Sequence, residues 1–194
     1  MQRRSFILGS AAVTGALALS ACGSVSTVGT TTGNRPVQRR QKTDSDVDAA
    51  LARLTSMTPG AREVLGKARG SLVFPTVIAA GLGIGGQYGE GALRVGSLTE
   101  DYFSLASLSI GLQIGAQSKA IFFLFMTQDA LDKFRRSQGW SVGADASVAV
   151  LHTGANGAID INSITAPVVA FIMTNTGLMA NLTLEGTKVT RLQS

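Results

Sequence analysis

The sequence predicts an α+β domain in which a glycine-rich antiparallel β body, barrel- or sandwich-like, carries two N-terminal helices and one internal helix. Three observations lead to this fold class. Glycine is abundant, with 23 residues in a chain of 194, whereas aromatic residues make up only 6%. Charged residues make up 15% of the chain, well below the usual quarter. From residue 71 onward, short apolar or alternating segments are separated by turn signals, which is typical of closely packed strands.

Residues 1–21 have the organisation of a secretory signal peptide. Arg3 and Arg4 precede a charge-free run that is too short and too rich in small residues to predict a membrane span. The run ends in Leu-Ser-Ala-Cys, the lipobox of bacterial lipoproteins, so we expect cleavage before Cys22 and acylation of that cysteine. The paired arginines also resemble the twin-arginine export motif, which leaves Sec and twin-arginine export open. We expect a lipid-anchored protein of the bacterial envelope, at the outer membrane because no aspartate follows Cys22.

Residues 22–45 are expected to form a flexible basic linker, because segments of this composition do not bury enough apolar surface to fold. Its cations are suited to anionic head groups, each being worth about 1 kcal/mol near such a surface. Residues 1–70 hold ten of the 17 basic and four of the 12 acidic residues of the chain. The net charge of +5 therefore comes from residues 1–70 and not from the rest of the chain. A nucleic-acid-binding domain would carry its positive charge on the folded body, and we therefore expect no nucleic acid as a partner.

Two amphipathic helices are expected to open the folded domain, which we assign to residues 46–194. Asp44 or Ser45 is the expected N-cap of the first helix. Pro59 suits the first position of the second helix, and Gly70 its end. Apolar residues recur at helical spacing in both, opposite a basic polar side.

The remaining sequence predicts strands and one helix. Segment 108–118 alternates apolar residues with small or neutral polar ones, so we expect a strand with one apolar face and a second, closely packed face. The most apolar run, 121–126, is expected to be a fully buried strand, and the charge pattern favours a helix over about 128–137. Further strands are expected at 72–74, 82–88, 92–95, 102–105, 142–151, 168–174 and 178–184, with turns at 96–97 and 175–177.

Two motifs suggest enzymes but lack the necessary context. Residues 81–86 satisfy G-x-G-x-x-G, yet no helix is expected to begin there to hold a pyrophosphate, and strand packing or a bulge explains the glycines more simply. Residues 139–143 satisfy G-x-S-x-G, but a helix precedes the motif and a strand follows, the reverse of a hydrolase elbow. One extended strand would separate Ser141, Asp145 and His152 by about 13 to 35 Å. We therefore expect no enzyme.

No cofactor or metal site is expected either. Cys22 is the only cysteine and His152 the only histidine, which excludes metal sites built from several such residues of one chain. Isolated acidic residues are expected to accept backbone hydrogen bonds at turns or to pair with basic residues: Glu90, Asp145, Asp160 and Glu185.

Segments spread in order over residues 46–194 resemble the SYLF domain family. They are Val73-Phe74-Pro75, 83–91 (GIGGQYGEG), 109–117 (SIGLQIGAQ), 125–127 (FMT), 130–131 (AL), 139–140 (GW), 143–147 (GADAS), 177–179 (GLM) and 185–187 (EGT). The resemblance implies a lipid-binding module. Eukaryotic members bind phosphoinositides, some fungal members bind and bundle actin, and bacterial members are commonly exported proteins or lipoproteins.

In eukaryotic members a basic amphipathic segment at the start of the domain is implicated in membrane contact. The matching region here is 46–70, and its candidates for contact with lipid head groups are Arg53, Arg62, Lys67 and Arg69. An exported bacterial protein does not meet actin or phosphoinositides, so we expect membrane phospholipid, in particular anionic phospholipid, and not actin as the partner. An alternative stays open: an envelope scaffold that binds a protein through the neutral strand face and has no lipid ligand of its own.

Overall fold

The computed structural model describes residues 35–151, 159, 164–175, 177–178 and 184–193, with side chains at all of these positions except 35, 82–84 and 109–116. Its main feature is a long hairpin: β1 (Gly70–Val95) and β2 (Leu98–Phe125) pair antiparallel and are joined by a turn at Gly96. Gly96 has a φ of 61°, a left-handed conformation that favours glycine. The six short strands expected between residues 72 and 126 are therefore two continuous strands.

Irregularities in the pairing occur where the sequence pattern breaks. The register of the β1–β2 pair shifts between Phe74 and Val77, between Gly81 and Gly83, and between Leu93 and Arg94. The second shift lies inside the G-x-G-x-x-G segment, which runs through β1 without a helix. The interpretation of these glycines as strand residues at a bulge is therefore confirmed.

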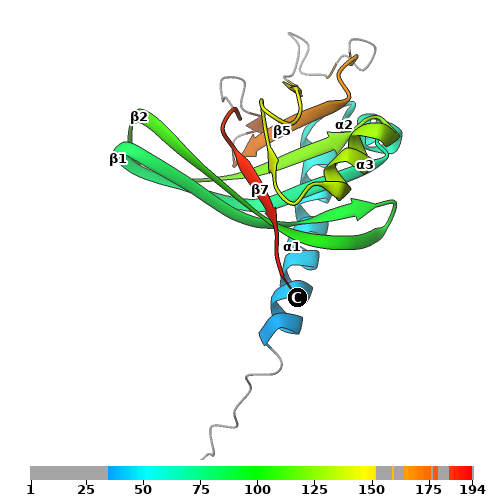
Figure 1. The fold of residues 1–194 in the computed structure, drawn as a ribbon, viewed down its shortest axis with the longest axis horizontal. Helices are drawn as coiled ribbons and strands as arrows, with labels where there is room; N and C mark the ends of the chain where they lie inside the picture. Colours follow the sequence, from blue (N-terminus) through cyan, green and yellow to red (C-terminus); the bar gives the residue numbers. More distant parts are fainter. Residues whose placement is uncertain (1–34, 152–158, 160–163, 176, 179–183, 194) are drawn as a thin grey trace, which may run out of the picture. The chain divides into compact units, whose positions relative to one another are not determined.

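The hairpin bends back on itself, so that the two halves of β1 touch (Figure 1). A Cβ atom on Gly89 would lie 2.7 Å from the carbonyl oxygen of Thr76 and 2.8 Å from Cγ2 of Val77. A Cβ atom on Gly91 would overlap the carbonyl oxygen of Val73 and lie 2.8 Å from Cδ1 of Phe74. Only a residue without a side chain permits two backbones to cross this closely.

The other strands extend the sheet from the second edge of β2. β5 (Val168–Thr174) pairs with residues 120–125, and β7 (Lys188–Arg191) pairs with residues 103–106. The short strands β3 (Trp140–Ser141) and β6 (Gly177–Leu178) pair with β7 and β5 respectively. Residues 179–183, the remainder of the strand expected at 178–184, lie outside the described residues.

β4 (Val148–Val150) lies parallel to β5, so the described strands form one mixed, seven-stranded sheet. The α+β class is confirmed, but the expectation of an antiparallel β body is wrong for the β4–β5 pair. Residues 151–167 separate the two strands, and a connection of that length permits the chain to return to the same end of the sheet before the second strand begins.

Two apolar clusters hold the fold together. The inner cluster lies within the curl of the sheet and is aromatic at its centre, where the Trp140 ring is 5.3 Å from Phe123 and 5.5 Å from Phe134 between ring centroids. The outer cluster joins the opposite face of β5 and the end of β2 to the N-terminal helices. Residues 121–125 are fully buried, which confirms the expected buried strand, because alternate side chains enter the two clusters.

Among the described residues, the members of both clusters lie between Val47 and Val189. Gly33–Ser194 forms one compact unit. The expected signal peptide and Cys22 lie outside the described residues.

Three helices are described: α1 (Arg35–Met57), α2 (Ala61–Lys67) and α3 (Gln128–Arg136). α3 confirms the prediction, and Thr127 caps it by accepting a hydrogen bond from the Ala130 backbone N–H. None of these helices is long and apolar enough to cross a membrane.

α1 begins at Arg35, inside the segment that composition predicts to be a linker, so that expectation is wrong for residues 35–45. Contacts with distant residues explain the difference. Arg39 forms an ion pair with Glu90 on β1, and a guanidinium nitrogen of Arg94 lies 3.5 Å from a carboxylate oxygen of Asp44. A local pair, Lys42 with Asp46 four residues later, adds to them.

Candidate functional site

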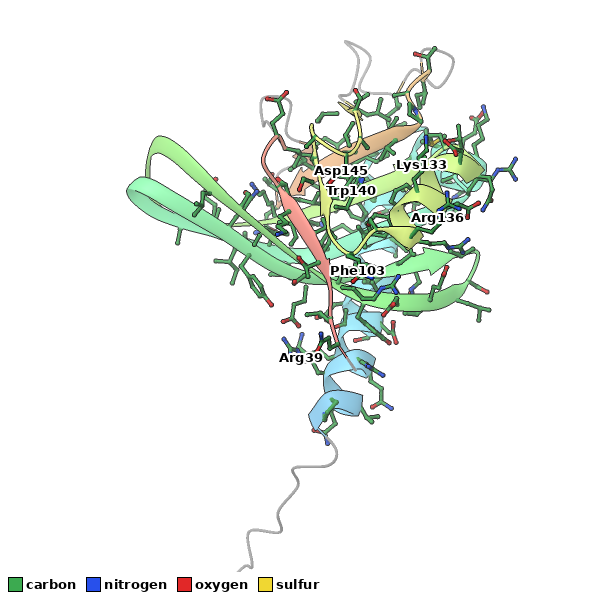
Figure 2. All side chains as sticks on the ribbon, viewed as in Figure 1. Arg39, Phe103, Lys133, Arg136, Trp140 and Asp145 are labelled. Carbon is green, nitrogen blue, oxygen red and sulfur yellow. The ribbon has the colours of Figure 1, made fainter. Side chains whose placement is uncertain are left out.

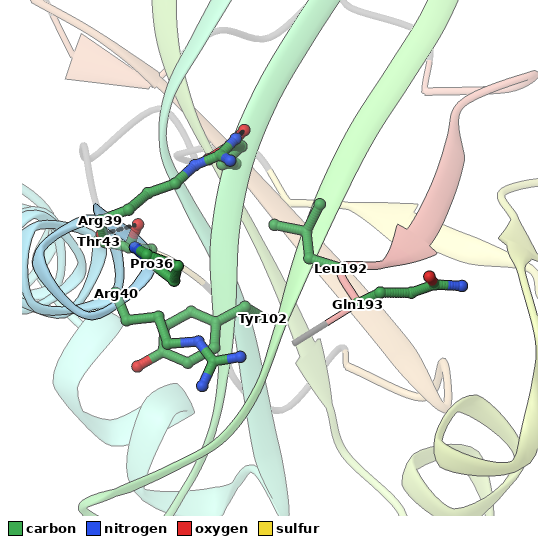
Figure 3. A pocket seen from close by; sticks show the side chains of 8 residues that line it. Pro36, Arg39, Arg40, Thr43, Tyr102, Leu192 and Gln193 are labelled. Atoms are coloured by element: carbon green, nitrogen blue, oxygen red, sulfur yellow. Dashed lines mark hydrogen bonds and ion pairs between the residues drawn. The ribbon is translucent and has the colours of Figure 1, made fainter. Parts of the chain in front are cut away.

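A pocket of about 260 Å³ lies where the first half of α1 meets β1, β2 and the C-terminal segment (Figure 3). Its walls combine apolar groups with a tyrosine, two arginines and one glutamate: Pro36, Arg39, Arg40, Thr43, Glu90, Tyr102, Leu192 and Gln193. Because Glu90 pairs with Arg39, the pocket offers apolar surface beside the positive charge of Arg40.

The carboxylate of Asp44 fixes the helix and the pocket wall to each other. It accepts hydrogen bonds from the Tyr102 hydroxyl at 2.8 Å and from the Thr99 hydroxyl at 2.6 Å. Arg94, whose side chain is largely buried, also contacts Asp48 on α1 at 2.8 Å. Burial, together with the hydrogen bond to Asp44, raises the pKa of Tyr102 to about 12. The Tyr102 hydroxyl, which donates to Asp44, therefore keeps its proton to a higher pH than an ordinary tyrosine does.

The cations at the start of α1 differ in how far their charge is compensated. Arg39 forms an ion pair with Glu90, which also accepts a hydrogen bond from the Tyr88 hydroxyl at 2.8 Å. The guanidinium of Arg40 lies 5.3 Å from the centroid of the Tyr102 ring, a cation–π geometry visible in Figure 3. Among the described residues, Arg40 has no ion pair, so its charge is open to an incoming anion.

The start of α1 carries positive charge without an acidic residue to compensate it. α1 has no acidic residue in its first turn, and Arg39, Arg40 and Lys42 follow closely. The positive end of the dipole and the arginines therefore add up to a site that suits an anion such as a phosphate group.

The residues that sequence reasoning selected do not meet at this pocket. Arg53 donates hydrogen bonds to the Thr174 carbonyl at 2.9 Å and to the Asn175 side chain at 3.3 Å, and so ties α1 to the end of β5. The other three residues belong to α2 and the segment after it. Arg62, Lys67 and Arg69 are exposed, and Lys67 pairs with Glu63 at 3.3 Å.

Sequence reasoning missed Arg40 and Tyr102 as a pair. The doublet of arginines at 39–40 was visible, but only as part of an expected linker. Tyr102 carries no local signal, because its partner Asp44 is 58 positions away in the chain.

The G-x-S-x-G segment contains the short strand β3 and turns at Gly143, so it does not continue as one extended strand. Gly143 has a left-handed φ of 92°, and the Asp145 carboxylate accepts a hydrogen bond from the Ser141 backbone N–H at 2.6 Å. The strand expected at 142–151 is therefore reduced to β4, and the separation of Ser141 from Asp145 worked out for one extended strand is wrong. His152 and Asp160 lie outside the described residues.

The expected roles of two isolated acids are confirmed, since Asp145 accepts a backbone hydrogen bond and Glu90 pairs with arginine. Asp145 also lines, with Trp140 and Lys133, a hollow of about 350 Å³ beside α3 (Figure 2). Within the described part of the chain, no three His, Cys, Asp or Glu side chains converge in a way that could hold a metal ion.

Residues 106–194 match the model of a protein family described as "Ysc84: Las17-binding protein actin regulator". A search of the curated proteins finds no match. The matched part runs from the middle of β2 through α3 to the C-terminal segment, and it includes the pocket residues Leu192 and Gln193. α1, α2 and β1 precede it. The resemblance to the SYLF domain is thereby confirmed for residues 106–194, which match the model of the Ysc84 (SYLF) family.

Proposed function

We propose that the protein is a lipid-anchored protein of the bacterial envelope, at the outer membrane, whose SYLF domain binds anionic phospholipid and catalyses no reaction. Family membership suggests an interaction of the lipid- or actin-binding type. The lipobox before Cys22 favours lipid, because an acylated cysteine would keep the domain next to a bilayer. No catalytic constellation is proposed.

The observation that carries the proposal is the unpaired charge of Arg40 in a pocket that also offers apolar surface. A guanidinium donates paired hydrogen bonds to phosphate oxygens, which suits the phosphodiester of a lipid head group. The Tyr102 ring holds this guanidinium from one side, and Pro36 and Leu192 supply apolar surface for the adjoining glycerol. Arg39 adds positive charge at the rim of the same pocket.

The test is co-sedimentation with vesicles, using the chain from Gly23 onward, which contains all described residues and lacks Cys22. Binding should require phosphatidylglycerol in the vesicles and fall as salt rises, since exposed charges are screened over about 8 Å at physiological ionic strength. Arg40→Gln should weaken binding about fivefold, because one cation near an anionic surface is worth about 1 kcal/mol. Equal binding by Arg40→Gln and the unmodified chain would remove the pocket from the proposal.

Arg136→Gln is the matched control, because it removes the same charge from α3, where Arg136 is exposed and has no ion pair within the described residues. A smaller loss is expected for this variant than for Arg40→Gln. The exposed residues Arg62 and Lys67 provide the second comparison. If their joint replacement by Gln weakens binding more than Arg40→Gln does, then α2, and not the pocket, makes the main head-group contact.

An envelope scaffold that binds a protein is the second candidate. The observation in its favour is that Leu108, on the strand expected to offer a protein contact, is exposed. Crosslinking in cells that yields one stoichiometric protein partner, together with no affinity for any vesicle, would support the scaffold and exclude the lipid-binding proposal.

A further inference from the structure

The bend of the β1–β2 hairpin exposes large apolar side chains. Leu108 is 85% exposed, Ile78 is 55% exposed and Tyr88 is 51% exposed. These three residues line a shallow groove of about 460 Å³, together with small residues such as Ala80 and Ala106. Leu108 begins the apolar face that the alternating pattern predicts, and this face is open at Leu108.

Charge is absent from this part of both strands. Residues 77–89 and 102–118 contain no Asp, Glu, Lys or Arg. They are paired with each other, with Ile78 opposite Ser118, Gly86 opposite Leu108 and Tyr88 opposite Ala106. Strands that face water usually carry charged side chains, which also prevent association through exposed edges. An uncharged hairpin with exposed apolar groups therefore indicates a surface that is covered in use.

The rim of the groove is basic. Lys188, at the start of β7, is exposed. It lines the groove and carries a charge, whereas the other described lining residues are uncharged. The Glu90 carboxylate, which accepts a hydrogen bond from the Tyr88 hydroxyl, is compensated by its ion pair with Arg39. Apolar side chains with a tyrosine and a lysine are the combination found at the interface of anionic membranes. A two-fold contact with a second copy would bring two Lys188 side chains into one interface, which favours the bilayer over self-association.

We propose that this bend is a second membrane contact, which inserts Leu108, Ile78 and the Tyr88 ring into the interface of an anionic phospholipid bilayer while Lys188 meets the head groups. The inference rests on the proposed phospholipid binding and names the element that penetrates the bilayer. Residues 23–34 can span at most about 40 Å, so acylation at Cys22 would hold the domain within reach of the membrane. The pocket at Arg40 supplies the electrostatic part of binding, and the bend supplies the apolar part.

The experiment places an environment-sensitive fluorophore at the bend. The chain from Gly23 onward has no cysteine, so Leu108→Cys provides a single labelling site for a nitrobenzoxadiazole dye. Leu98→Cys is the matched control, because Leu98 is 74% exposed on the same strand but lies beside the turn at the other end. The two positions are separated by ten residues, about 33 Å along a strand.

With vesicles of phosphatidylglycerol and phosphatidylethanolamine, the dye at position 108 should shift to shorter wavelength and be quenched by lipids that carry a quencher on the acyl chain. The dye at position 98 should show neither change. Full binding by sedimentation without any change at position 108 would overturn the inference and leave the phospholipid-binding proposal standing. Absence of binding to any vesicle would overturn both. A concentration-dependent change at position 108 without vesicles would assign the groove to a second copy and also overturn the inference.

Affinity provides the second readout. Leu108→Ser should weaken vesicle binding about tenfold, which corresponds to about 1.4 kcal/mol, and the loss should persist at high salt because the contact is apolar. Leu98→Ser should bind like the unmodified chain. Both leucines are exposed, so neither replacement removes a core contact. Equal affinity of the two variants would contradict insertion at the bend.

Discussion

Replacing Gly91 by alanine tests the crossing of the two halves of β1, on which the fold depends. The new Cβ atom would lie 2.8 Å from the carbonyl carbon of Val73 and 2.8 Å from Cδ1 of Phe74, whereas ordinary contact begins at 3.4 Å. The obstacle is mainly backbone, so the two halves must separate, and the inner cluster that contains Phe74 must open with them. Insertion of atoms into a packed core costs about 1–3 kcal/mol and more where the backbone must shift.

We therefore expect Gly91→Ala to lower the free energy of unfolding by at least about 3 kcal/mol, a large part of the 5–15 kcal/mol typical of a domain. The corresponding fall in Tm is about 6–12 °C, at 2–4 °C per kcal/mol for a domain of this size. Urea unfolding of the chain from Gly23 onward measures it. Trp140 is the only tryptophan and is 4% exposed within the inner cluster, so its fluorescence reports on that cluster directly.

Gly86→Ala is the matched control in the same strand. A Cβ atom there would meet only the carbonyl oxygen of Ser107, at 3.7 Å, which is ordinary contact. Alanine also restricts the unfolded chain more than glycine does, so this variant should be neutral or more stable by up to about 1 kcal/mol. Unfolding free energies of Gly91→Ala and Gly86→Ala that agree within about 0.5 kcal/mol would refute the crossing.

Three further predictions concern a buried lysine, the pocket tyrosine and the anchor. Lys119 is 8% exposed and has no ion pair or hydrogen bond among the described residues, and burial lowers its pKa. The folded state therefore disfavours the charged form, and stability should rise as the pH increases through the lowered pKa toward 10.5. Lys119→Met should raise stability at pH 7 by about 1 kcal/mol and abolish this rise; a less stable variant in thermal unfolding would contradict the assignment. Tyr102 has its pKa raised to about 12, so the stability that it contributes should be complete below pH 10 and disappear as the pH rises through about 12. Absorbance at 295 nm should show a phenol that ionises near pH 12 and is missing in Tyr102→Phe; ionisation of that phenol near pH 10 would contradict the contact with Asp44. Acylation should be found at Cys22 by mass spectrometry of the mature protein, with an uncleaved precursor in Cys22→Ser, and a mature chain without acyl groups would exclude the anchor.

Elements with local signals could be predicted from the sequence. α3 follows from a capping threonine, Asp129 in its first turn and Arg135 and Arg136 in its last, all within ten positions. The buried run at 121–125 follows from uninterrupted apolar residues. Both signals act over a few residues, so neither needs knowledge of the tertiary structure.

Features that depend on distant contacts could not be predicted in this way. The start of α1 at Arg35 depends on Glu90 and Arg94, and the pocket depends on Tyr102 meeting Asp44. The small residues of the hairpin did indicate a close approach of backbone, but not which segments meet. The approach occurs at Gly89 and Gly91, and its partner is the first part of the same strand.

The head-group contacts expected from the sequence stay a prediction, but the structure shows what else those residues contact. Basic residues on an N-terminal helix were expected to meet lipid head groups. Arg53, however, is used to hold the end of β5, while Arg40 lies in the pocket. Helical periodicity shows which side of a helix is polar, but it does not show which cations are already bound by backbone oxygens elsewhere in the chain.

On the proposed function, the domain binds anionic phospholipid through its own residues, independently of acylation. The most direct measurement is co-sedimentation of the chain from Gly23 onward with vesicles that contain phosphatidylglycerol and with vesicles of phosphatidylcholine alone. We expect strong, salt-sensitive binding to the vesicles with phosphatidylglycerol, which Arg40→Gln weakens about fivefold, and much weaker binding to phosphatidylcholine alone. Equal and negligible binding to both kinds of vesicle would contradict the proposed function.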